Sequence, residues 1–359
     1  MSQTPRVLHV VQSGDRGGVQ RHVRDVATGL RPLTAGVVTG TGGWLAEELA
    51  AAGIPAVRAP ALRRALDPLA VAAAGREVRQ AARNLGANTV HAHGIFALLA
   101  AQRVPGLPLV YTAHGFLWHD PAHPAWLRHL ARRIHRGLAP RLAALVAVSA
   151  QDARDAAALG IPPERIHRIA NGVALEAGEP LQGPPPRVIG TAGRLVPGKG
   201  VEDVLRLTAL LPADVALHVA GTGPAEAGLK RRAEGLGLGA RVRWLGWVDD
   251  MGGFYRGLGV YATLSRKEGL PYAVLDAMAH GVPVVASAIP AHAEILDGAT
   301  WGVLIADGNL ARAVEGVGAW LGDPAAWAEA SAAARGDAAD RFGLEAMLER
   351  LAGMYRQGT

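Results

Sequence analysis

The stretch RVIGTAGRLVPGKGVEDVLRLTALL (187–211) decides the fold class. Residues 187–194 are rich in small and apolar side chains and end in a glycine turn, which is typical of a buried strand. Residues 200–211 repeat apolar side chains at helical spacing, so we expect a helix there. A strand that passes through a glycine loop into a helix is the repeating unit of a parallel sheet covered on both faces.

The same alternation runs through both halves of the chain. Further strands are expected at 6–11, 34–39, 88–93, 108–115 and 143–149, and at 215–223, 241–246, 260–265 and 282–287. The stretch GEPLQGPPP (178–186) cannot continue a helix or a central strand, so it is expected to separate two domains. Ligands bind beyond the carboxyl ends of the strands in open parallel sheets, so residues that directly follow a strand are the candidate site residues.

Length and composition agree with two soluble α/β domains. The chain has 359 residues, half of them apolar, and no cysteine, which excludes disulfides and thiolate metal sites. The N-terminal residues MSQTPRVLHVVQSGD show no signal-peptide pattern, and no window approaches 18 apolar residues without charge. We therefore expect a cytoplasmic protein without a membrane-spanning helix.

Positive charge is concentrated in the first half. Residues 1–183 contain 20 arginines, no lysine and 12 acidic residues, whereas residues 184–359 contain 17 basic and 19 acidic residues. This asymmetry suggests an anionic partner such as nucleic acid, a lipid surface or a phosphate-bearing acceptor. The alternative is a general preference for arginine in the source proteome, because 34 of the 37 basic residues are arginine.

The stretch PAWLRHLARRIHRGLAPRL (124–142) predicts a basic amphipathic helix. Its apolar residues fall near one face and arginines surround them, so the helix is suited to an anionic membrane surface. The other interpretation is that its apolar face packs on the sheet, as crossover helices do.

Two glycine loops that follow strands are candidate anion sites. GRLVPGKG (193–200) offers Arg194, Lys199 and free amides at a helix start, which together suit a diphosphate; the alternative is two solvated charges on a turn. In GDRGGVQRHV (14–23), Gly17 and Gly18 would let a ligand approach the backbone, or would form a plain turn.

The stretch SRKEGLPYAVLDAMAHGVPVVAS (265–287) carries two carboxylates that one ligand can reach. Glu268 directly follows a strand, and Asp276 lies eight residues later in the following helix. Carboxylates accept hydrogen bonds from pairs of sugar hydroxyls. An acidic loop that complements a helix dipole is the alternative interpretation of Glu268.

Three residues after Glu268 lead into the expected helix. Pro271 fits the first helical position, and the amides at Gly269 and Leu270 could hold phosphate. The dipole alone does not explain this Gly-Leu-Pro sequence.

His114 ends the stretch PLVYTAHG (108–115), where an imidazole could donate to a sugar hydroxyl or carry a proton. A structural role is the alternative. Other histidines, such as His91 and His93, show neither HExxH nor His-plus-carboxylate spacing, and there is no Asp-x-Asp. No metal site is therefore expected.

The order and spacing of these motifs resemble those of the family 4 retaining glycosyltransferases, which have the GT-B fold. The likeness covers nearly the whole chain and rests on GGVQRHV (17–23), TAHG (112–115), NGV (171–173), GRLVPGKG (193–200), GTGP (221–224) and EGLPYAVLDAMAHGVPVVAS (268–287). It implies two Rossmann-like domains that face each other across a cleft: an acceptor-binding domain (1–180) and a nucleotide-sugar-binding domain (187–340). A C-terminal helix (341–359) is expected to cross back to the first domain.

The resemblance also implies roles for single residues. Arg194 and Lys199 match the pair that binds the donor diphosphate, and Glu268 matches the acid that contacts the donor sugar. Asp276 stands where the family usually has a Glu that binds the ribose, and its side chain is one methylene shorter. His114 matches a histidine near the donor sugar.

Further matches concern loops. Gly17 and Gly18 match the glycine loop beside the reacting centre, and Leu270 belongs to the segment whose amides hold phosphate. Trp247 and Val248 lie in the loop that usually flanks the nucleobase.

We therefore expect a retaining, metal-independent hexosyltransferase that needs no cofactor. Its donor is expected to be a nucleotide sugar, UDP-linked rather than GDP-linked, and its acceptor a sugar or lipid-linked saccharide in polysaccharide or glycolipid synthesis. The implied location is cytoplasmic, with peripheral contact to an anionic inner membrane face and no nucleic-acid partner. The alternatives are a nucleotide-sugar epimerase of the same fold and a non-catalytic module that binds anionic lipids through residues 124–142.

Overall fold

A computed structural model describes residues 4–63, 67–175, 183–306 and 308–357. The chain divides into two compact units, which we call unit 1 (residues 1–171 and 345–359) and unit 2 (residues 172–344). Part of the stretch expected to separate two domains, residues 178–182, lies outside the described residues.

Unit 1 is built on a seven-stranded parallel sheet with the order β3-β2-β1-β4-β5-β6-β7. Its strands are β1 (Val7–Ser13), β2 (Thr34–Thr41), β3 (Ala56–Arg58), β4 (Thr89–His93), β5 (Leu109–Thr112), β6 (Ala144–Ala147) and β7 (Ile166–Arg168). The strand order changes direction between β1 and β4. In sheets of this kind, the carboxyl ends of the two strands at such a switch point border the ligand site.

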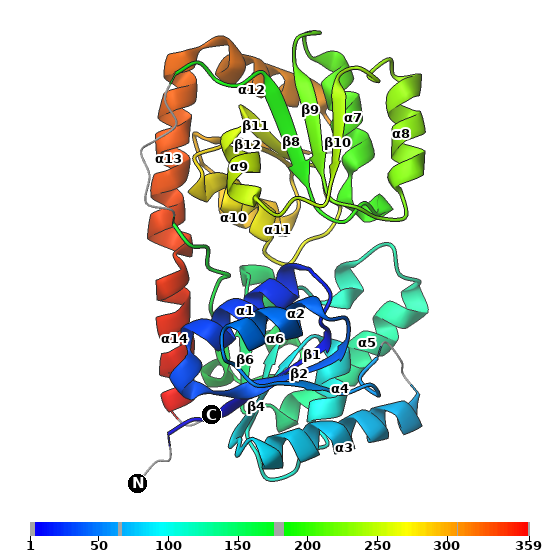
Figure 1. Ribbon diagram of the computed structural model, residues 1–359, viewed down its shortest axis with the longest axis vertical. Helices are drawn as coiled ribbons and strands as arrows, with labels where there is room; N and C mark the ends of the chain where they lie inside the picture. Colours follow the sequence, from blue (N-terminus) through cyan, green and yellow to red (C-terminus); the bar gives the residue numbers. More distant parts are fainter. Residues whose placement is uncertain (1–3, 64–66, 176–182, 307, 358–359) are drawn as a thin grey trace. The chain divides into compact units, whose positions relative to one another are not determined.

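Helices cover both faces of this sheet: in Figure 1, α1 and α2 lie on one side of β1 and β2, and α3 and α4 on the other. The helices of unit 1 are α1 (Gly18–Gly29), α2 (Trp44–Ala51), α3 (Pro68–Asn84), α4 (Ile95–Ala101), α5 (Ala125–Leu138), α6 (Ala150–Ala158) and α14 (Leu344–Arg356). Because both faces are covered, β4 is buried along its whole length, although three of its five residues are polar: Thr89, His91 and His93.

The C-terminal helix α14 belongs to unit 1, as predicted. Tyr355 is 3% exposed, and its hydroxyl lies 2.6 Å from Nδ1 of His91 on β4, although 264 residues separate the two. Gly29 at the end of α1 makes room for Leu348, since a Cβ at Gly29 would lie 2.4 Å from that side chain.

Unit 2 is built on a six-stranded parallel sheet with the order β10-β9-β8-β11-β12-β13, which is the Rossmann order. Its strands are β8 (Val188–Ala192), β9 (Ala216–Ala220), β10 (Val242–Gly246), β11 (Val260–Thr263), β12 (Val284–Ser287) and β13 (Gly302–Ile305). The switch point lies between β8 and β11.

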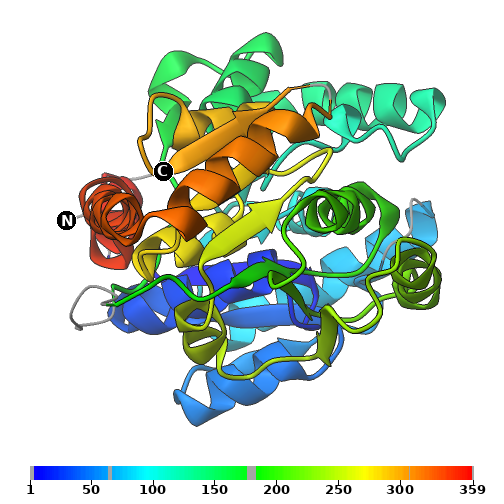
Figure 2. The same cartoon turned by 90° about the horizontal axis from the view of Figure 1, so that it is seen from above.

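The helices of unit 2 are α7 (Val201–Leu210), α8 (Glu226–Gly235), α9 (Met251–Arg256), α10 (Tyr272–Ala279), α11 (Pro290–Leu296), α12 (Leu310–Gly322) and α13 (Pro324–Phe342). Figure 1 shows α7 and α8 on one side of β8–β10 and α9 and α10 on the other, and Figure 2 shows the same layers from above. Two buried tryptophans satisfy their indole N–H groups, as burial requires: Trp327 donates to the carbonyl of Gly259 at 2.8 Å, and Trp301 to Asp337 at 3.0 Å.

Every strand expected from the sequence is present, which confirms the two-domain α/β architecture. Three strands were missed: β3, β7 and β13 are three or four residues long, too short to show a hydrophobic period. One helix start is corrected. Pro271 has extended backbone angles (φ −77°, ψ 115°) and is the N-cap of α10, which begins at Tyr272. Among the described residues, no helix is long and apolar enough to cross a membrane.

Candidate functional site

Two loops of unit 2 meet at its switch point. The loop after β8 contacts the loop after β11: the amide of Arg266 donates to the carbonyl of Gly198 at 3.0 Å, and Ser265 Oγ donates to the carbonyl of Lys199 at 3.4 Å. Gly200 has φ 66°, and a Cβ there would lie 2.0 Å from the carbonyl oxygen of Leu264. Glycine is therefore required at position 200 for this close approach.

The contact brings Lys199 and Glu268 together, although 69 residues separate them. Lys199 Nζ donates to both carboxylate oxygens of Glu268, at 2.7 and 2.9 Å. The Glu268 side chain is 13% exposed and that of Lys199 is 35% exposed. The pair therefore places an anion-binding ammonium next to a hydroxyl-binding carboxylate, beyond the carboxyl ends of β8 and β11.

Tyr261 connects this pair with the second predicted carboxylate. Its hydroxyl donates to the carbonyl of Ala192 at 3.2 Å, which ties β11 to the end of β8. Burial raises the pKa of the phenol, and the nearby carboxylates of Glu268 and Asp276 raise it further. Both carboxylates therefore act on one buried ring, and Asp276 lies partly buried on α10.

Gly269 is partly buried and Leu270 is 4% exposed, directly before the N-cap of α10. The two residues therefore lie beside the N-terminus of α10, the end of a helix that favours anions.

Arg194 lies on the surface of the loop after β8. Within the part of the chain that the structure describes, its side chain has no ion-pair partner. The loop itself is fixed by Gly221 (φ 121°), where a Cβ would lie 2.0 Å from the carbonyl oxygen of Gly193. Arg194 therefore extends from a rigid turn and supplies a second cation near the switch point.

Trp247 and Val248 follow β10, the outer strand on the β9 side of the sheet. The Trp247 ring is 52% exposed, and its indole N–H donates to Asp249 at 2.7 Å. Val248 is partly buried. An exposed aromatic ring held by a hydrogen bond is suited to stacking on a flat ligand group such as a base.

His292 is a further candidate site residue that was not predicted from the sequence. This fully buried residue of α11 follows β12, and its Nδ1 donates to the carbonyl of Ser287 at 2.9 Å. Burial lowers its pKa, and the charges of Glu268 and Lys199 act on it in opposite directions, so it lies near that pair. The rule that ligands bind beyond the carboxyl ends of strands would have found it.

Unit 1 contains a cluster of histidines from β1, α1, β4 and the turn after β5, which we call the histidine cluster. Its members are His9, His22, His91, His93 and His114. Burial lowers the pKa of each ring, and the charges of neighbouring imidazoles lower most of them further. The pKa of His9 falls to about 3 and that of His22 to about 4. All five rings are therefore neutral near pH 7.

His114 lies in this cluster with a strained backbone. Its φ is 55°, and it is the non-glycine residue with positive φ in the described ranges 4–63, 67–175, 183–306 and 308–357. This left-handed conformation costs about 1 kcal/mol and is typical of functional positions. The amide of Gly115, also in the left-handed region, donates to Asp152 at 3.3 Å and secures the turn. β5 ends at Thr112, two residues before His114.

Gly17 is the exposed N-cap of α1, and Gly18 is its exposed first residue. The helix that they begin carries His22, whose ring centroid lies 4.8 Å from that of His114. The predicted glycine loop and the predicted histidine therefore belong to one region of unit 1.

Two trios within the histidine cluster have ring nitrogens within 4.8 Å of one another: His9, His91 and His93, and His22, His93 and His114. Imidazole nitrogen is a common ligand of Zn²⁺. In the first trio, however, both nitrogens of His91 are already engaged, by the Tyr355 hydroxyl at 2.6 Å and the Thr112 hydroxyl at 2.7 Å. A metal ion in that trio would have to displace one of these bonds.

The chain is similar to known proteins over most of its length. The sequence profile described as "Glycosyltransferase Family 4" matches residues 16–177, and that described as "Glycosyl transferases group 1" matches residues 178–337. The chain is 31% identical over 307 residues to "D-inositol 3-phosphate glycosyltransferase 1" of Catenulispora acidiphila, covering 75% of this chain and 72% of that protein. The chain belongs to the family 4 glycosyltransferases. The resemblance inferred from the sequence is thereby confirmed.

Other proteins match this chain over shorter segments or in fold. The "Lipopolysaccharide core biosynthesis mannosyltransferase LpsB" of Rhizobium meliloti is 33% identical over 182 residues, covering 48% of this chain; the match spans 52% of that relative, about half of its length. The crystal structure of Anabaena Alr3699/HepE in complex with UDP superposes with a TM-score of 0.82 at 22% identity, covering 98% of this chain and all of that one. The GT-B class expected from the sequence is confirmed at the level of fold.

Proposed function

We propose that this family 4 glycosyltransferase moves a hexose from a nucleotide sugar to an acceptor with retention of configuration. The observation that carries the proposal is the Lys199–Glu268 pair at the switch point of unit 2. There, an ammonium group that can bind phosphate lies next to a carboxylate that can bind hydroxyls. A nucleotide sugar has its diphosphate joined directly to the sugar that carries the hydroxyls, so the pair suits such a ligand.

In this proposal, Arg194 and Lys199 bind the donor diphosphate, with help from the amides of Gly269 and Leu270. When phosphate binds, the Lys199 ammonium shares its three protons between phosphate and carboxylate. Glu268 then accepts hydrogen bonds from the sugar hydroxyls.

Asp276 is proposed to bind the ribose, and the Trp247 and Val248 loop to flank the base. Asp276 is shorter than the usual glutamate by one methylene, so its contact with the ribose is expected to be longer or to include a water molecule.

Unit 1 is proposed to bind the acceptor, with Gly17, Gly18 and His114 beside the reacting sugar. Retention fits attack on the face from which the diphosphate leaves. A bond forms between the acceptor oxygen and the anomeric carbon, the bond from that carbon to phosphate oxygen breaks, and the acceptor proton moves to the released phosphate. The protein contributes positioning and charge stabilisation to this step, and Arg194 and Lys199 stabilise the leaving diphosphate.

We propose UDP as the nucleotide, ahead of GDP, and a polysaccharide or glycolipid as the product. In support, structures of HepE contain UDP and UDP-glucose. LpsB, in turn, is named for lipopolysaccharide core biosynthesis. The name of a further relative, the "GDP-mannose-dependent alpha-mannosyltransferase" of Mycobacterium tuberculosis, keeps GDP as the competing nucleotide.

The test is a thermal-shift screen of UDP- and GDP-linked hexoses, followed by product analysis with the donor that stabilises the protein. A ligand that binds only the folded state raises its melting temperature, so one stabilising donor identifies both base and sugar. Sugar found on an added acceptor supports transfer. An epimer formed from donor alone supports the epimerase alternative and contradicts the proposal.

We further propose that α5 touches the anionic inner face of the cell membrane, which would place the protein at the cytoplasmic side. One face of α5 packs within unit 1 through Ala131, His135 and Leu138, as the packing interpretation expects. Trp126 and Leu130 nevertheless remain 66% and 37% exposed. An exposed tryptophan beside arginines is suited to the interface of an anionic membrane.

Liposome co-sedimentation tests this contact. Arg132→Glu combined with Arg136→Glu should reduce binding to vesicles with phosphatidylglycerol at low salt. The matched control reverses two exposed arginines of α3, Arg76→Glu with Arg83→Glu, and should reduce binding less. Equal effects of both pairs would contradict a role of α5. Lipid binding without any sugar transfer would support the non-catalytic alternative.

A further inference from the structure

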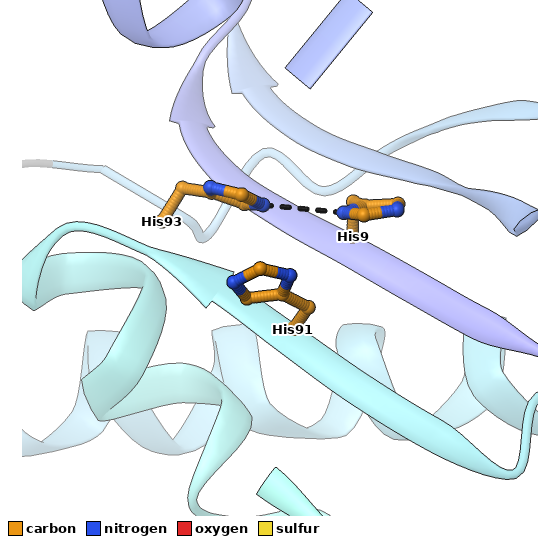
Figure 3. A group of neighbouring side chains, drawn as sticks. All are labelled: His9, His91 and His93. Carbon is orange, nitrogen blue, oxygen red and sulfur yellow. Dashed lines mark hydrogen bonds between the residues drawn. The ribbon is translucent and has the colours of Figure 1, made fainter. Parts of the chain in front are cut away.

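Three rings of the histidine cluster form a hydrogen-bonded chain. His9 Nδ1 lies 3.2 Å from His93 Nε2, and His93 Nδ1 lies 3.1 Å from His114 Nε2. Figure 3 shows the first of these bonds, between rings that β1 and β4 bring side by side. The chain thus runs from the buried core of unit 1 to His114, which is partly buried.

Both ends of the chain are informative. His9 Nε2 is buried and has no hydrogen-bond partner among the residues that the structure describes. His114 Nδ1, at the other end, has no recorded hydrogen bond to any residue in the same ranges. This row of three hydrogen-bonded rings therefore ends at a buried nitrogen of His9, and at its other end Nδ1 of His114 can bond a ligand.

Neutral imidazoles impose a direction on such a chain. Each neutral ring has one N–H donor and one acceptor nitrogen. If His93 donates to one neighbour, it must accept from the other, so both bonds run in the same direction. Only two proton arrangements are possible, and they differ in which end nitrogen carries a proton.

The buried end decides between these arrangements. If the protons sit toward the core, His9 Nε2 carries an N–H that has no acceptor, and buried orphan N–H groups are rarer than under-used acceptors. If the protons sit toward His114, only an acceptor nitrogen of His9 remains unused. The second arrangement is preferred: His9 Nδ1–H donates to His93, and His93 Nδ1–H donates to His114.

We propose that His9 and His93 are positioning residues that hold His114 in the tautomer with its proton on Nδ1, so that this nitrogen donates to an oxygen of a bound sugar. The role as sugar donor rests on the proposed function; the tautomer does not. The strained backbone of His114 supports the proposal, because the left-handed turn holds the ring at the end of the chain.

His91 stands beside the chain without belonging to it. Its two nitrogens bond the hydroxyls of Tyr355 and Thr112, which accept or donate as the ring requires. His91 therefore does not compete for the His93 proton and packs against that ring, with centroids 4.2 Å apart.

Long-range ¹H–¹⁵N correlation spectra of histidine-labelled full-length protein test the tautomer directly, because protonated and bare ring nitrogens have well-separated shifts. The His114 signals are assigned by their loss in His114→Gln. We expect a proton on Nδ1 of His114 between pH 6.5 and 8. A proton on Nε2 would overturn the proposal, as would a stoichiometric transition metal in the purified protein, since a metal would occupy the acceptor nitrogens.

Two substitutions at position 93 test the cause. His93→Leu removes donor and acceptor, so His114 should populate both tautomers, and kcat should fall about tenfold with little change in the donor KM. His93→Gln keeps a donor and an acceptor and should restore most of the tautomer preference and rate. His129→Gln on the exposed face of α5 is the control and should change neither.

An unchanged Nδ1–H signal in His93→Leu would overturn the role of His93. If His93→Leu does not fold, the wild-type spectrum and His93→Gln still decide the direction of the chain. The spectra can be recorded without turnover. If the protein transfers no sugar but shows the expected tautomer, the proposed function is contradicted and the positioning role of His9 and His93 is still supported.

Discussion

The histidine cluster predicts that unit 1 loses stability at mildly acidic pH. Burial holds the pKa of His9 at about 3 and that of His22 at about 4, against 6.5 in the unfolded chain. Between these values the unfolded state binds more protons than the folded state, so acidification favours unfolding. The free energy of unfolding is therefore unaffected by these two histidines above pH 6.5, and it decreases as the pH falls from 6.5 toward their folded-state pKa values.

The magnitude follows from the size of the interval. Each pH unit below 6.5 lowers the free energy of unfolding by about 1.4 kcal/mol per histidine. At pH 5, each of these two residues therefore lowers it by about 2 kcal/mol relative to pH 7.5. His91, His93 and His114 act in the same direction, because their pKa values are also well lowered. The two residues alone remove about 4 kcal/mol, a large share of the 5–15 kcal/mol that stabilises a typical domain.

Hydrogen exchange measured by mass spectrometry is the assay, with rates corrected for the intrinsic effect of pH. Amides of β1 and β4 should lose protection between pH 7.5 and 5 much more than those of β8 and β11. The strands of unit 2 serve as the internal reference within the same molecule.

A substitution separates this cluster from other titrating groups. His9→Gln should make the decrease in the free energy of unfolding between pH 7.5 and 5 smaller by about 2 kcal/mol. This difference does not depend on how much the substitution destabilises the protein at neutral pH. His129→Gln, on the exposed face of α5, should leave the pH dependence unchanged. Equal loss of protection in both units, or an unchanged slope in His9→Gln, would refute the reasoning.

Three further predictions concern unit 2 and the metal-free mechanism. Lys199→Ala should lower kcat/KM by an amount that corresponds to roughly 2–4 kcal/mol of transition-state stabilisation. Lys230→Ala, which breaks an exposed ion pair within a helix, should leave kcat/KM unchanged. A wild-type kcat/KM in Lys199→Ala would reject the diphosphate role. Gly221→Ala should lower the melting temperature through a backbone clash, while Gly228→Ala, with open space around it, should not. EDTA should leave transfer intact, and strict dependence on added Mn²⁺ would contradict this.

Local patterns were sufficient for the architecture and for several site residues. The strand at 187–194 and the helix after it could be read from composition and period alone, because a buried parallel strand and an amphipathic helix need different spacing of apolar residues. The glycines of the loop between them were interpreted only as part of an anion site, and the structure adds a packing reason at Gly200, where a Cβ would lie 2.0 Å from the carbonyl oxygen of Leu264. The strands β3 and β13 escaped notice because three or four residues carry no period.

Pairings between distant residues were beyond the reach of the sequence. Lys199 and Glu268 were each predicted as site residues, but their ion pair depends on β8 lying next to β11, which no local pattern reveals. His292 had a local signal, because it follows β12, but its nearness to that pair depends on the order of strands.

The histidine cluster shows the division most clearly. The sequence alone determined that His91, His93 and His114 lie near the ends of buried strands. Only the tertiary structure decided that β1 and β4 are neighbours, that His9 lies opposite His91, and that His9 and His93 share a hydrogen bond. Secondary structure follows from the period of side chains along a few residues, whereas strand order follows from the burial of whole helices and sheets against one another, which is a property of the complete chain.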